Sequence, residues 1–407
     1  MTGFAAAITG IGLVTPAGVS VPDNWERVVA GRPTAAHAPG LAGLPVPMAC
    51  QVPDFGTALN GMRGARQWDR YTQFAVVAAY EALAQAGFTA GDWPDSARVA
   101  VVVGSGAGGT ATLEEQHAVL LAEGPDDVSP LTLPMGLLNM AAGQVAIELK
   151  ANGPCLAPCS ACASGASAIG MARDMLRTGV ADIVVAGGAE APVTPLYASA
   201  FARMRALSRR VDDPQSASRP FDVDRDGFVL GEGAGIFVME SEEHARSRGA
   251  QPIAKVVGYG ASADAHHVTQ PHPDGLGAKL AVRAALKDAG LTGADVAYVN
   301  AHGTSTPRND AVESAVIREV LGAGTAVSST KGVTGHPLGA AGAIEAAYAA
   351  LTVQRGVIPP TANLTTPDPV VDVDLVYKAA RQGPVDVALS NSFGFGGQNT
   401  ALLIAAA

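Results

Sequence analysis

A cysteine set among small residues is the most reactive side chain in this sequence. Cys162 follows Cys159-Ser160-Ala161 and precedes Ala163-Ser164-Gly165, after which an apolar helical pattern continues to Leu176. The pattern predicts a tight turn that opens a helix, where the helix dipole and free backbone N–H groups lower a thiol pKa below its usual value of about 8.5. The resulting thiolate is the nucleophile that acyl transfer needs. A buried structural cysteine is the alternative for this segment taken alone.

Cys159 and Cys162 also form a Cys-x-x-Cys pair, a spacing found in metal and redox sites. No second cysteine pair or nearby histidine completes a zinc set, and no thioredoxin-like sequence surrounds the pair. We therefore expect neither a metal ion nor another cofactor.

Two histidines and a lysine lie in loops rich in glycine and hydroxyl residues. His302 follows the apolar run 296–300, at the carboxyl end of an expected strand, where open α/β sheets bind ligands, and Glu313 comes shortly after it. Lys331 and His336 lie in a second glycine-lined loop that carries almost no other charge. A histidine satisfied within the core and a solvated lysine are the ordinary alternatives for each segment by itself.

Near the C-terminus, the segment 390–399 places two phenylalanines among three glycines. It predicts an aromatic gate on a flexible hinge, with backbone N–H groups available to an oxyanion. A glycine-rich turn with core aromatics is the alternative.

Short apolar runs that end in glycine or a small polar residue alternate with alanine-rich stretches of helical spacing. Such runs are 98–103, 181–186, 296–300 and 385–389. The alternation predicts an α/β fold with helices layered against largely parallel sheets. The segments 4–12 and 253–260 share a weak similarity, since each has the pattern of a strand followed by glycine, which indicates two halves, residues 1–251 and 252–407. The polar stretch 208–235 is expected to be a long loop.

Composition limits the partners and the compartment. The chain has 407 residues, 48% of them hydrophobic and 16% charged, with a formal net charge of −10. Without a block of Lys or Arg, nucleic acid is not expected as a partner. Four cysteines are too few for a disulfide scaffold and no signal-peptide pattern is seen, so we expect a cytoplasmic protein. No apolar run approaches the ~18 residues of a membrane-spanning helix, so no membrane partner is expected.

Together and in this order, the four motifs resemble those of the elongating β-ketoacyl-acyl carrier protein synthases, synthases I and II, of the thiolase superfamily. The likeness extends from Ile8 essentially to the C-terminus. It implies a thiolase-like fold in which two pseudo-symmetric α/β halves form a five-layered α/β/α/β/α core. It also implies that an acyl thioester condenses with malonyl-acyl carrier protein as carbon dioxide is lost. The product is two carbons longer, in fatty acid or type II polyketide (including polyene) biosynthesis.

The resemblance assigns catalytic roles. Cys162 accepts the acyl group, in an oxyanion hole formed by its own backbone N–H and that of Phe393. His302 and His336 hydrogen-bond the malonyl thioester oxygen, so that decarboxylation leaves a stabilised enolate. Lys331 orients the histidines and sets their protonation together with Glu313.

The resemblance also assigns substrate contacts, with two departures from the family pattern. Ala107 stands where a bulky isoleucine commonly forms the floor of the acyl pocket, and Thr132 stands where an aromatic residue commonly enters the tunnel from the dimer partner. Because both replacements are small, we expect long, polyunsaturated or polyketide-like chains. The remaining assignments are the gate Phe393 with its neighbours Gly394, Phe395, Gly396 and Gly397, the second aromatic wall Phe228, and the pantetheine contacts Thr269, Thr304 and Thr306.

Two kinds of partner follow from the resemblance. Acyl carrier proteins are acidic, so a basic patch is expected to bind one, and Arg66 and Arg205 align with carrier contacts in relatives, with Arg63 beside the first. The family forms an obligatory dimer, which here is either a homodimer or a heterodimer with a chain-length-factor-like subunit.

Two rival functions come from other classes. The segment 104–109 reads G-x-G-x-x-G after a strand, the fingerprint of a nicotinamide oxidoreductase, although the acidic residue expected after the next strand is missing. A non-catalytic chain-length-factor-like subunit is the second rival. Such subunits generally lack the nucleophile, which is present here.

Overall fold

The fold uses one arrangement of five strands twice along the chain. The computed structural model describes residues 3–407. In each half the first two strand contacts are antiparallel and the next two are parallel. The first set has the spatial order β1 (Ala6–Val14), β7 (Gly233–Ser241), β6 (Ile183–Glu190), β4 (Val99–Gly104) and β5 (Cys155–Leu156). The second set has the order β8 (Ala254–Ala263), β15 (Gln398–Ala405), β14 (Val387–Gly394), β9 (Tyr298–Asn300) and β10 (Ala326–Ser328).

The two sets join edge to edge through residues 6–8 of β1 and 254–256 of β8. With β12 (Asp374–Leu375) beside β10, they form an eleven-stranded sheet. The expectation of largely parallel sheets was wrong for its centre, where β1, β7, β8 and β15 pair only antiparallel. Strand–helix alternation predicts parallel units, but it carries no sign of the antiparallel return of β7 and β15. We propose that the halves meet between residues 251 and 252, just before β8.

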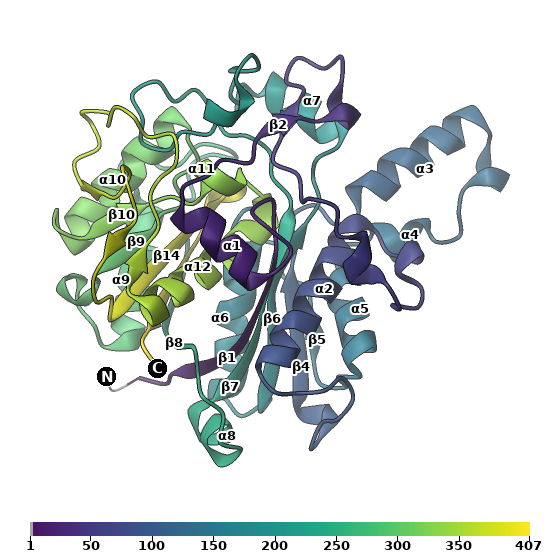
Figure 1. Cartoon of the computed structure of the whole chain (residues 1–407), viewed down its shortest axis with the longest axis horizontal. Helices are drawn as coiled ribbons and strands as arrows, with labels where there is room; N and C mark the ends of the chain where they lie inside the picture. The colour runs from purple at the N-terminus through teal and green to yellow at the C-terminus, as the bar shows by residue number, and fades with distance from the viewer. Residues whose placement is uncertain (1–2) are drawn as a thin grey trace.

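Helices form three layers, one outside each set of strands and one between the two sets. The two sets and the three helix layers together give the expected five-layered α/β/α/β/α order (Figure 1). The outer helices α2 (Arg70–Gln85) and α5 (Met140–Leu149) pack on the first set of strands. The outer helices α9 (Leu276–Ala289) and α10 (Pro307–Leu321) belong to the second. The helices α6 (Ser164–Arg177) and α12 (Ala341–Arg355) lie between the two sets.

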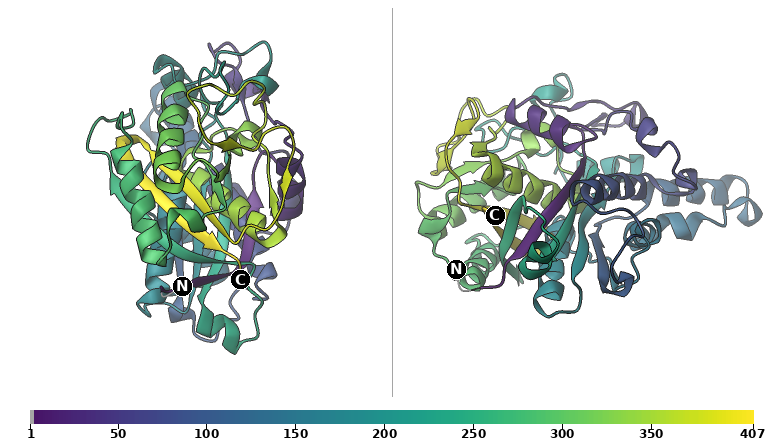
Figure 2. Two further views of the ribbon diagram at one scale, coloured as in Figure 1. Left: turned by 90° about the vertical axis from the view of Figure 1, so that its left-hand side faces the viewer. Right: turned by 60° about the horizontal axis from the view of Figure 1, so that its bottom comes forward.

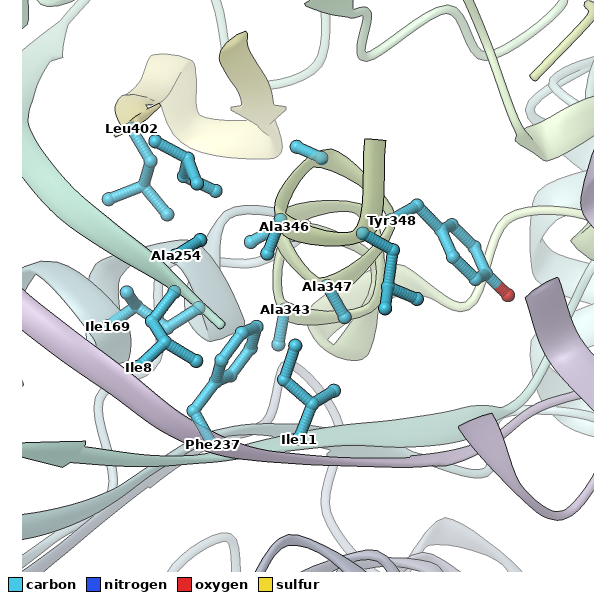
Figure 3. Packing of buried hydrophobic residues seen from close by; sticks show 14 of the residues in the cluster. Ile8, Ile11, Ile169, Phe237, Ala254, Ala343, Ala346, Ala347, Tyr348 and Leu402 are labelled. Atoms are coloured by element: carbon cyan, nitrogen blue, oxygen red, sulfur yellow. The ribbon is translucent and has the colours of Figure 1, made fainter. Parts of the chain in front are cut away.

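The central layer is built from small residues so that backbones approach closely. Helix α12 is apolar on nearly every side, and its alanines pack between strand residues such as Ile11, Phe237 and Leu402 (Figure 3). A Cβ atom on Gly165 of α6 would lie only 2.9 Å from the backbone nitrogen of Ala343 in α12. Glycine is therefore required where the two helices begin, directly beside the predicted nucleophile.

One part of the chain extends away from this body. Helices α3 (Thr110–Ala122) and α4 (Thr132–Gly136) project as an arm, which Figure 1 and the right-hand view of Figure 2 show. None of the helices in residues 3–407 is long and apolar enough to cross a membrane. The remaining elements are α1 (Val21–Val29), α7 (Pro195–Arg203), α8 (Glu242–Ser247) and α11 (Lys331–Thr334), with the strand pairs β2 (Ala36–His37) and β3 (Met48–Ala49), and β11 (Val357–Ile358) and β13 (Arg381–Gln382).

Candidate active site

Cys162 lies on the predicted turn, two residues before α6 begins at Ser164. The turn is strained, because Ala161 has a φ of 50°, and it is tied by Ser164, whose hydroxyl accepts from the backbone N–H of Ser160 and donates to the carbonyl of Ala161. The position of the nucleophile is therefore set by backbone geometry.

The predicted direction of the cysteine pKa was wrong. Burial raises the pKa of Cys162 to about 12, although the charge of Lys331 and the backbone N–H of Phe395 act in the opposite direction. The thiol is only 8% exposed, so the cost of burying a thiolate outweighs these favourable contacts. Without a bound substrate the thiol is therefore neutral, and its proton must leave if the sulfur is to attack.

The two histidines meet at the cavity that Cys162 lines. His302 follows β9 and His336 follows α11, and their ring centres are 5.3 Å apart with the planes at 84°. Both are buried, and burial lowers both pKa values well below the usual value, with Lys331 as the next cause. The imidazoles are therefore neutral near pH 7, and each can donate one hydrogen bond.

Lys331 is paired differently from the expectation. Its ammonium group contacts the carboxylate of Glu345 on α12, and both side chains are fully buried. Glu313 instead accepts from the backbone N–H groups of His302 and Gly303, each at 2.8 Å, and so holds the histidine loop itself. The predicted Lys331–Glu313 pair is thus corrected to Lys331–Glu345.

Glu345 is a site residue that the sequence reasoning missed. Burial raises its pKa to about 7, while the charge of Lys331 lowers it. The available signal was a lone glutamate in an alanine-rich helix, since a buried charge needs a partner.

Removal of one partner of this buried pair should be costly. We expect Glu345→Gln to lower the free energy of unfolding by about 3 to 5 kcal/mol, because the charge of Lys331 is left unpaired. The double variant Lys331→Met/Glu345→Leu should regain most of that stability but not the activity, since the histidines lose the positive charge beside them. Urea unfolding and a condensation assay of both variants measure the two effects. A double variant with full activity would contradict a role for Lys331 in the site.

The gate residue also differs from the expectation. Phe393 belongs to β14 and pairs with Asn399 of β15, so a regular ladder holds it. Phe395 instead lies in the glycine turn, next to Gly396 and Gly397 with φ values of 80° and 73°, and its backbone N–H acts to lower the pKa of Cys162. The structure therefore places Phe395, and not Phe393, in the glycine turn that was expected to act as the hinge.

A single cavity of about 440 Å³ brings most of the predicted residues together. The hydroxyls of Thr304 and Thr306 lie 2.9 Å apart on its wall. Phe201 of α7 also lines the cavity and packs edge to face with Phe228, a contact that no sequence signal indicated because Phe201 lies in an ordinary helical pattern. The predicted residues that line it are Cys162, Arg205, Phe228, Thr269, His302, Thr304, Thr306, Glu313, His336, Phe393, Gly394, Phe395 and Gly397; those that do not are Arg63, Arg66, Ala107, Thr132, Lys331 and Gly396.

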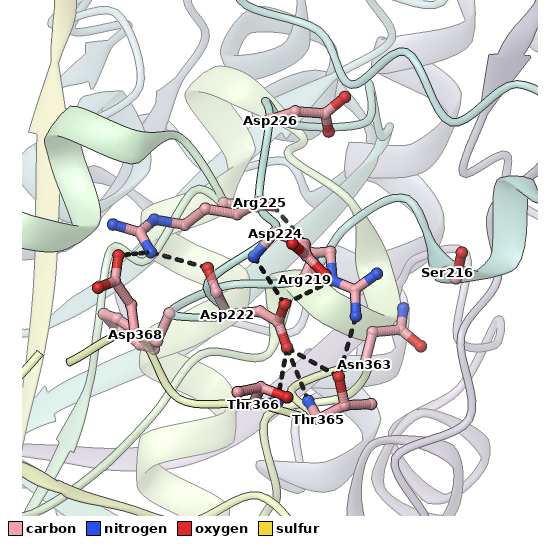
Figure 4. Close-up of polar contacts among 12 residues, drawn as sticks. Ser216, Arg219, Asp222, Asp224, Arg225, Asp226, Asn363, Thr365, Thr366 and Asp368 are labelled. Carbon is pink, nitrogen blue, oxygen red and sulfur yellow. Dashed lines mark hydrogen bonds and ion pairs between the residues drawn. The ribbon is translucent and has the colours of Figure 1, made fainter.

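The predicted long loop is pinned to the second half and holds Phe228 in place. Asp222 accepts from the backbone N–H groups of Thr365 and Thr366, and Arg225 pairs with Asp368 at 2.7 Å (Figure 4). Hydrogen bonds from backbone N–H groups and from the hydroxyl of Thr365 lower the pKa of Asp222 to about 2 in spite of burial. The loop therefore presents Phe228 rigidly, with its ring centre 5.2 Å from that of His336.

Known proteins resemble this chain over nearly its whole length. The sequence model of the beta-ketoacyl synthase N-terminal domain matches residues 5–245, and that of the C-terminal domain matches residues 253–365. The chain belongs to the beta-ketoacyl synthase family. It is 45% identical over 403 residues to the 3-oxoacyl-[acyl-carrier-protein] synthase 2 of Synechocystis sp., which covers 97% of this chain and 96% of that protein. The predicted family and enzyme class, a condensing enzyme, are confirmed.

Two solved structures share the fold. The ishigamide ketosynthase/chain length factor superposes with a TM-score of 0.92 and 34% identity, covering 100% of both chains. A type II polyketide synthase acyl-carrier protein in complex with its ketosynthase bound to the hexaketide gives a TM-score of 0.91 and 33% identity, again over 100% of both chains. The predicted thiolase-like fold class is thereby confirmed.

Proposed function

We propose that this chain catalyses the decarboxylating condensation of an acyl thioester, carried on Cys162, with a malonyl thioester on acyl carrier protein. The observation that carries the proposal is that Cys162, His302 and His336 line one cavity, while the buried charge of Lys331 acts on all three. A neutral thiol and two neutral imidazoles are suited to acyl transfer followed by enolate stabilisation.

In the first step the sulfur of Cys162 bonds to the acyl carbonyl carbon, and the carrier thiol departs with the cysteine proton. The N–H groups of Cys162 and Phe395 stabilise the oxyanion that forms. In the second step the bond between the malonyl methylene and its free carboxylate breaks, and carbon dioxide leaves. His302 and His336 donate hydrogen bonds to the thioester oxygen, which becomes the enolate oxygen. The enolate carbon then attacks the acyl group, and the sulfur of Cys162 departs as a thiolate, which takes up one proton from solvent to restore the neutral thiol.

The fate of the malonyl carbons tests this function. Label in the free carboxyl group should be released entirely as carbon dioxide, whereas label in the methylene carbon should be retained in a product two carbons longer. Hydrolysis of the acyl thioester without chain extension, or retention of the carboxyl label, would contradict the proposal. An isolated subunit that neither loads an acyl group nor releases carbon dioxide would favour the chain-length-factor-like function.

The nicotinamide alternative loses its support at the segment 104–109. The backbone N–H groups of Gly106 and Ala107, which a dinucleotide would need, bond instead to the carboxylate of Glu190 at 2.7 and 3.1 Å. A buried carboxylate at that position repels a pyrophosphate. The glycine pattern serves the protein's own packing.

The size of the acyl group accepted is proposed to be large. The turn that carries Ala107 adjoins the nucleophile loop, since the carbonyl of Gly106 lies 3.8 Å from the sulfur of Cys159. We expect Ala107→Ile to shorten the longest chain accepted, with kcat/KM for long acyl donors falling about 10- to 200-fold and that for short donors nearly unchanged. Competition among acyl-carrier substrates of graded length measures the profile. The prediction of long acyl chains depends on the small side chains of both Ala107 and Thr132. A sharp upper limit at medium acyl-chain length in the unaltered enzyme would contradict it.

An acidic carrier protein is the proposed substrate carrier. Arg205 is exposed at the rim of the cavity, and Arg63 and Arg66 are exposed near α2. Arg70, the next arginine along the chain after Arg66, is paired with Glu232 at 2.6 Å and is not counted among these carrier contacts. Electrostatic attraction between Arg205 and an acidic partner favours encounter at the mouth of the cavity.

A dimer is proposed because the arm and its neighbours expose many large apolar side chains. Apolar surface of this kind marks an interface rather than a free surface. The related ishigamide protein is a ketosynthase/chain length factor, which makes a heterodimer one of the two arrangements proposed here. Four free cysteines support a reducing cytoplasm as the compartment. The exposed residues are Leu113, Leu120, Leu121, Leu133, Leu137, Leu138, Ile147 and Leu156.

A further inference from the structure

Glu190, the last residue of β6, has a fully buried carboxylate that binds two separate turns at once. One oxygen accepts from the hydroxyl of Ser105 at 2.7 Å and from the N–H of Ala107 at 3.1 Å. The other accepts from the N–H of Gly106 at 2.7 Å and from the N–H of Gly339 at 2.9 Å. The first three donors follow β4, and the last lies three residues after His336.

All four partners are donors, so the carboxylate must accept at both oxygens. No cation lies within ion-pair distance of Glu190 among residues 3–407, and burial raises the pKa of Glu190 while the four hydrogen bonds lower it. A buried carboxylate without a cation is costly, and Glu190 offsets that cost by accepting from four donors that an apolar residue would leave unpaired. The carboxylate therefore links the turn after β4 to the turn after His336.

The two turns can approach each other closely because each has a glycine at the contact, Gly106 in the first turn and Gly339 in the second. A Cβ on Gly339 would lie 2.3 Å from the backbone nitrogen of Gly106, and a Cβ on Gly106 would lie 2.9 Å from the carboxylate oxygen of Glu190. The turns and the carboxylate therefore form one tightly packed unit, in which a shift of one part displaces the others.

The second turn carries strain that Glu190 holds in place. Leu338 has a φ of 39°, unusual for a residue with a side chain, and it lines the cavity with Cys162. The next N–H, that of Gly339, is the one bound by Glu190. Such strain persists only where surrounding contacts enforce it, and it gathers at functional sites.

We propose that Glu190 is a positioning residue that couples the turn of Ala107 to the turn of His336, so that seating of the acyl chain and placement of the decarboxylating histidine are set together. The proposal rests on the proposed function and adds a residue to it. Glu190 touches no reacting atom. It acts through Gly339 and Leu338 on His336, and through Gly106 on the wall beside the nucleophile loop.

Glu190→Gln tests the coupling with almost no change in size. In the glutamine an NH₂ group replaces one of the two carboxylate oxygens and faces the donors that this oxygen accepted. Because an NH₂ group cannot accept a hydrogen bond, at least one of the two turns must move. We expect the rate of carbon dioxide release to fall about 100-fold, the effect of displacing a catalytic group by about 1 Å, and the preference among acyl lengths to change. The KM for malonyl carrier protein should stay within about threefold.

Glu81→Gln is the matched structural control. Glu81 also accepts two backbone N–H groups, those of Leu13 at 2.8 Å and Val21 at 2.7 Å, but it lies on α2 away from the cavity. It should lower Tm without altering the ratio of decarboxylation to acyl loading. If Glu190→Gln lowered Tm and left that ratio and the acyl profile unchanged, as the control does, the coupling would be refuted.

Ser105→Ala removes one of the four donors and decides the matter if Glu190→Gln fails to fold. Ser105→Ala should change the ratio of decarboxylation to acyl loading, and the preference among acyl lengths, in the direction expected for Glu190→Gln but by a smaller factor. No change in either quantity would refute the coupling. Turnover of the unaltered protein is measured first. Its absence would refute the proposed function, while a normal turnover with unaltered ratios in the variants would refute only the role of Glu190.

Discussion

Replacement of Cys162 by alanine should abolish acyl loading and lower the condensation rate by about 10³-fold or more, because the acceptor atom of the first step is lost. The fold should survive, since the neighbouring turn is held by Ser164 and not by the sulfur. Loading is measured by the mass of the protein after incubation with acyl carrier substrate. The melting temperature of the variant shows whether it is folded.

Cys159→Ala is the matched control for this variant. Cys159 is exposed and only three residues away, and it should be dispensable for loading. Equal losses in the two variants would point to an effect of the whole loop, and an acylated Cys162→Ala protein would place the nucleophile elsewhere.

Loss of either imidazole should affect decarboxylation far more than acyl loading. We expect His302→Ala and His336→Ala each to slow carbon dioxide release by about 10²- to 10³-fold, the effect of one lost oxyanion donor. Loading of Cys162 should fall much less, because that step uses backbone N–H groups. Single-turnover measurements of the two half-reactions separate the effects. Equal losses in both steps would contradict a specific role in stabilising the enolate.

The same histidines determine the dependence on pH. Their pKa values are lowered below 6.5, so the neutral donors persist as the pH falls through 6.5 and are lost only under more acidic conditions. Since Lys331 is one cause of the lowering, Lys331→Met should raise both pKa values. The acidic limb of the decarboxylation profile should therefore move to higher pH. A limb that stayed in place would contradict an electrostatic role for Lys331.

Much of the fold followed from local patterns, and the parts that did not depend on distant contacts. The runs 98–103 and 181–186 correspond to β4 and β6, because an apolar run ending in glycine is a local property. The antiparallel pairing of β1 with β8 depends on how the two halves meet. A pattern within either strand does not contain that information.

The site shows the same division. The turn at Cys162 was predictable from its small residues, but the direction of its pKa depends on burial by segments distant in the sequence, which no local pattern encodes. The partner of Lys331 depends on how α12 packs, which places Glu345 rather than Glu313 against the ammonium group. Phe393 and Phe395 are only two residues apart, and the end of β14 separates their roles.

Peptide mapping of the protein during one catalytic cycle tests the central claim most directly. After incubation with acyl carrier substrate, the acyl mass should lie on the peptide that contains Cys162 and on no other. When malonyl carrier protein is added, that mass should disappear as carbon dioxide and a product two carbons longer are formed. An extended product without an acyl group ever detected on Cys162, or an acyl group there that malonyl carrier protein does not remove, would contradict the claim.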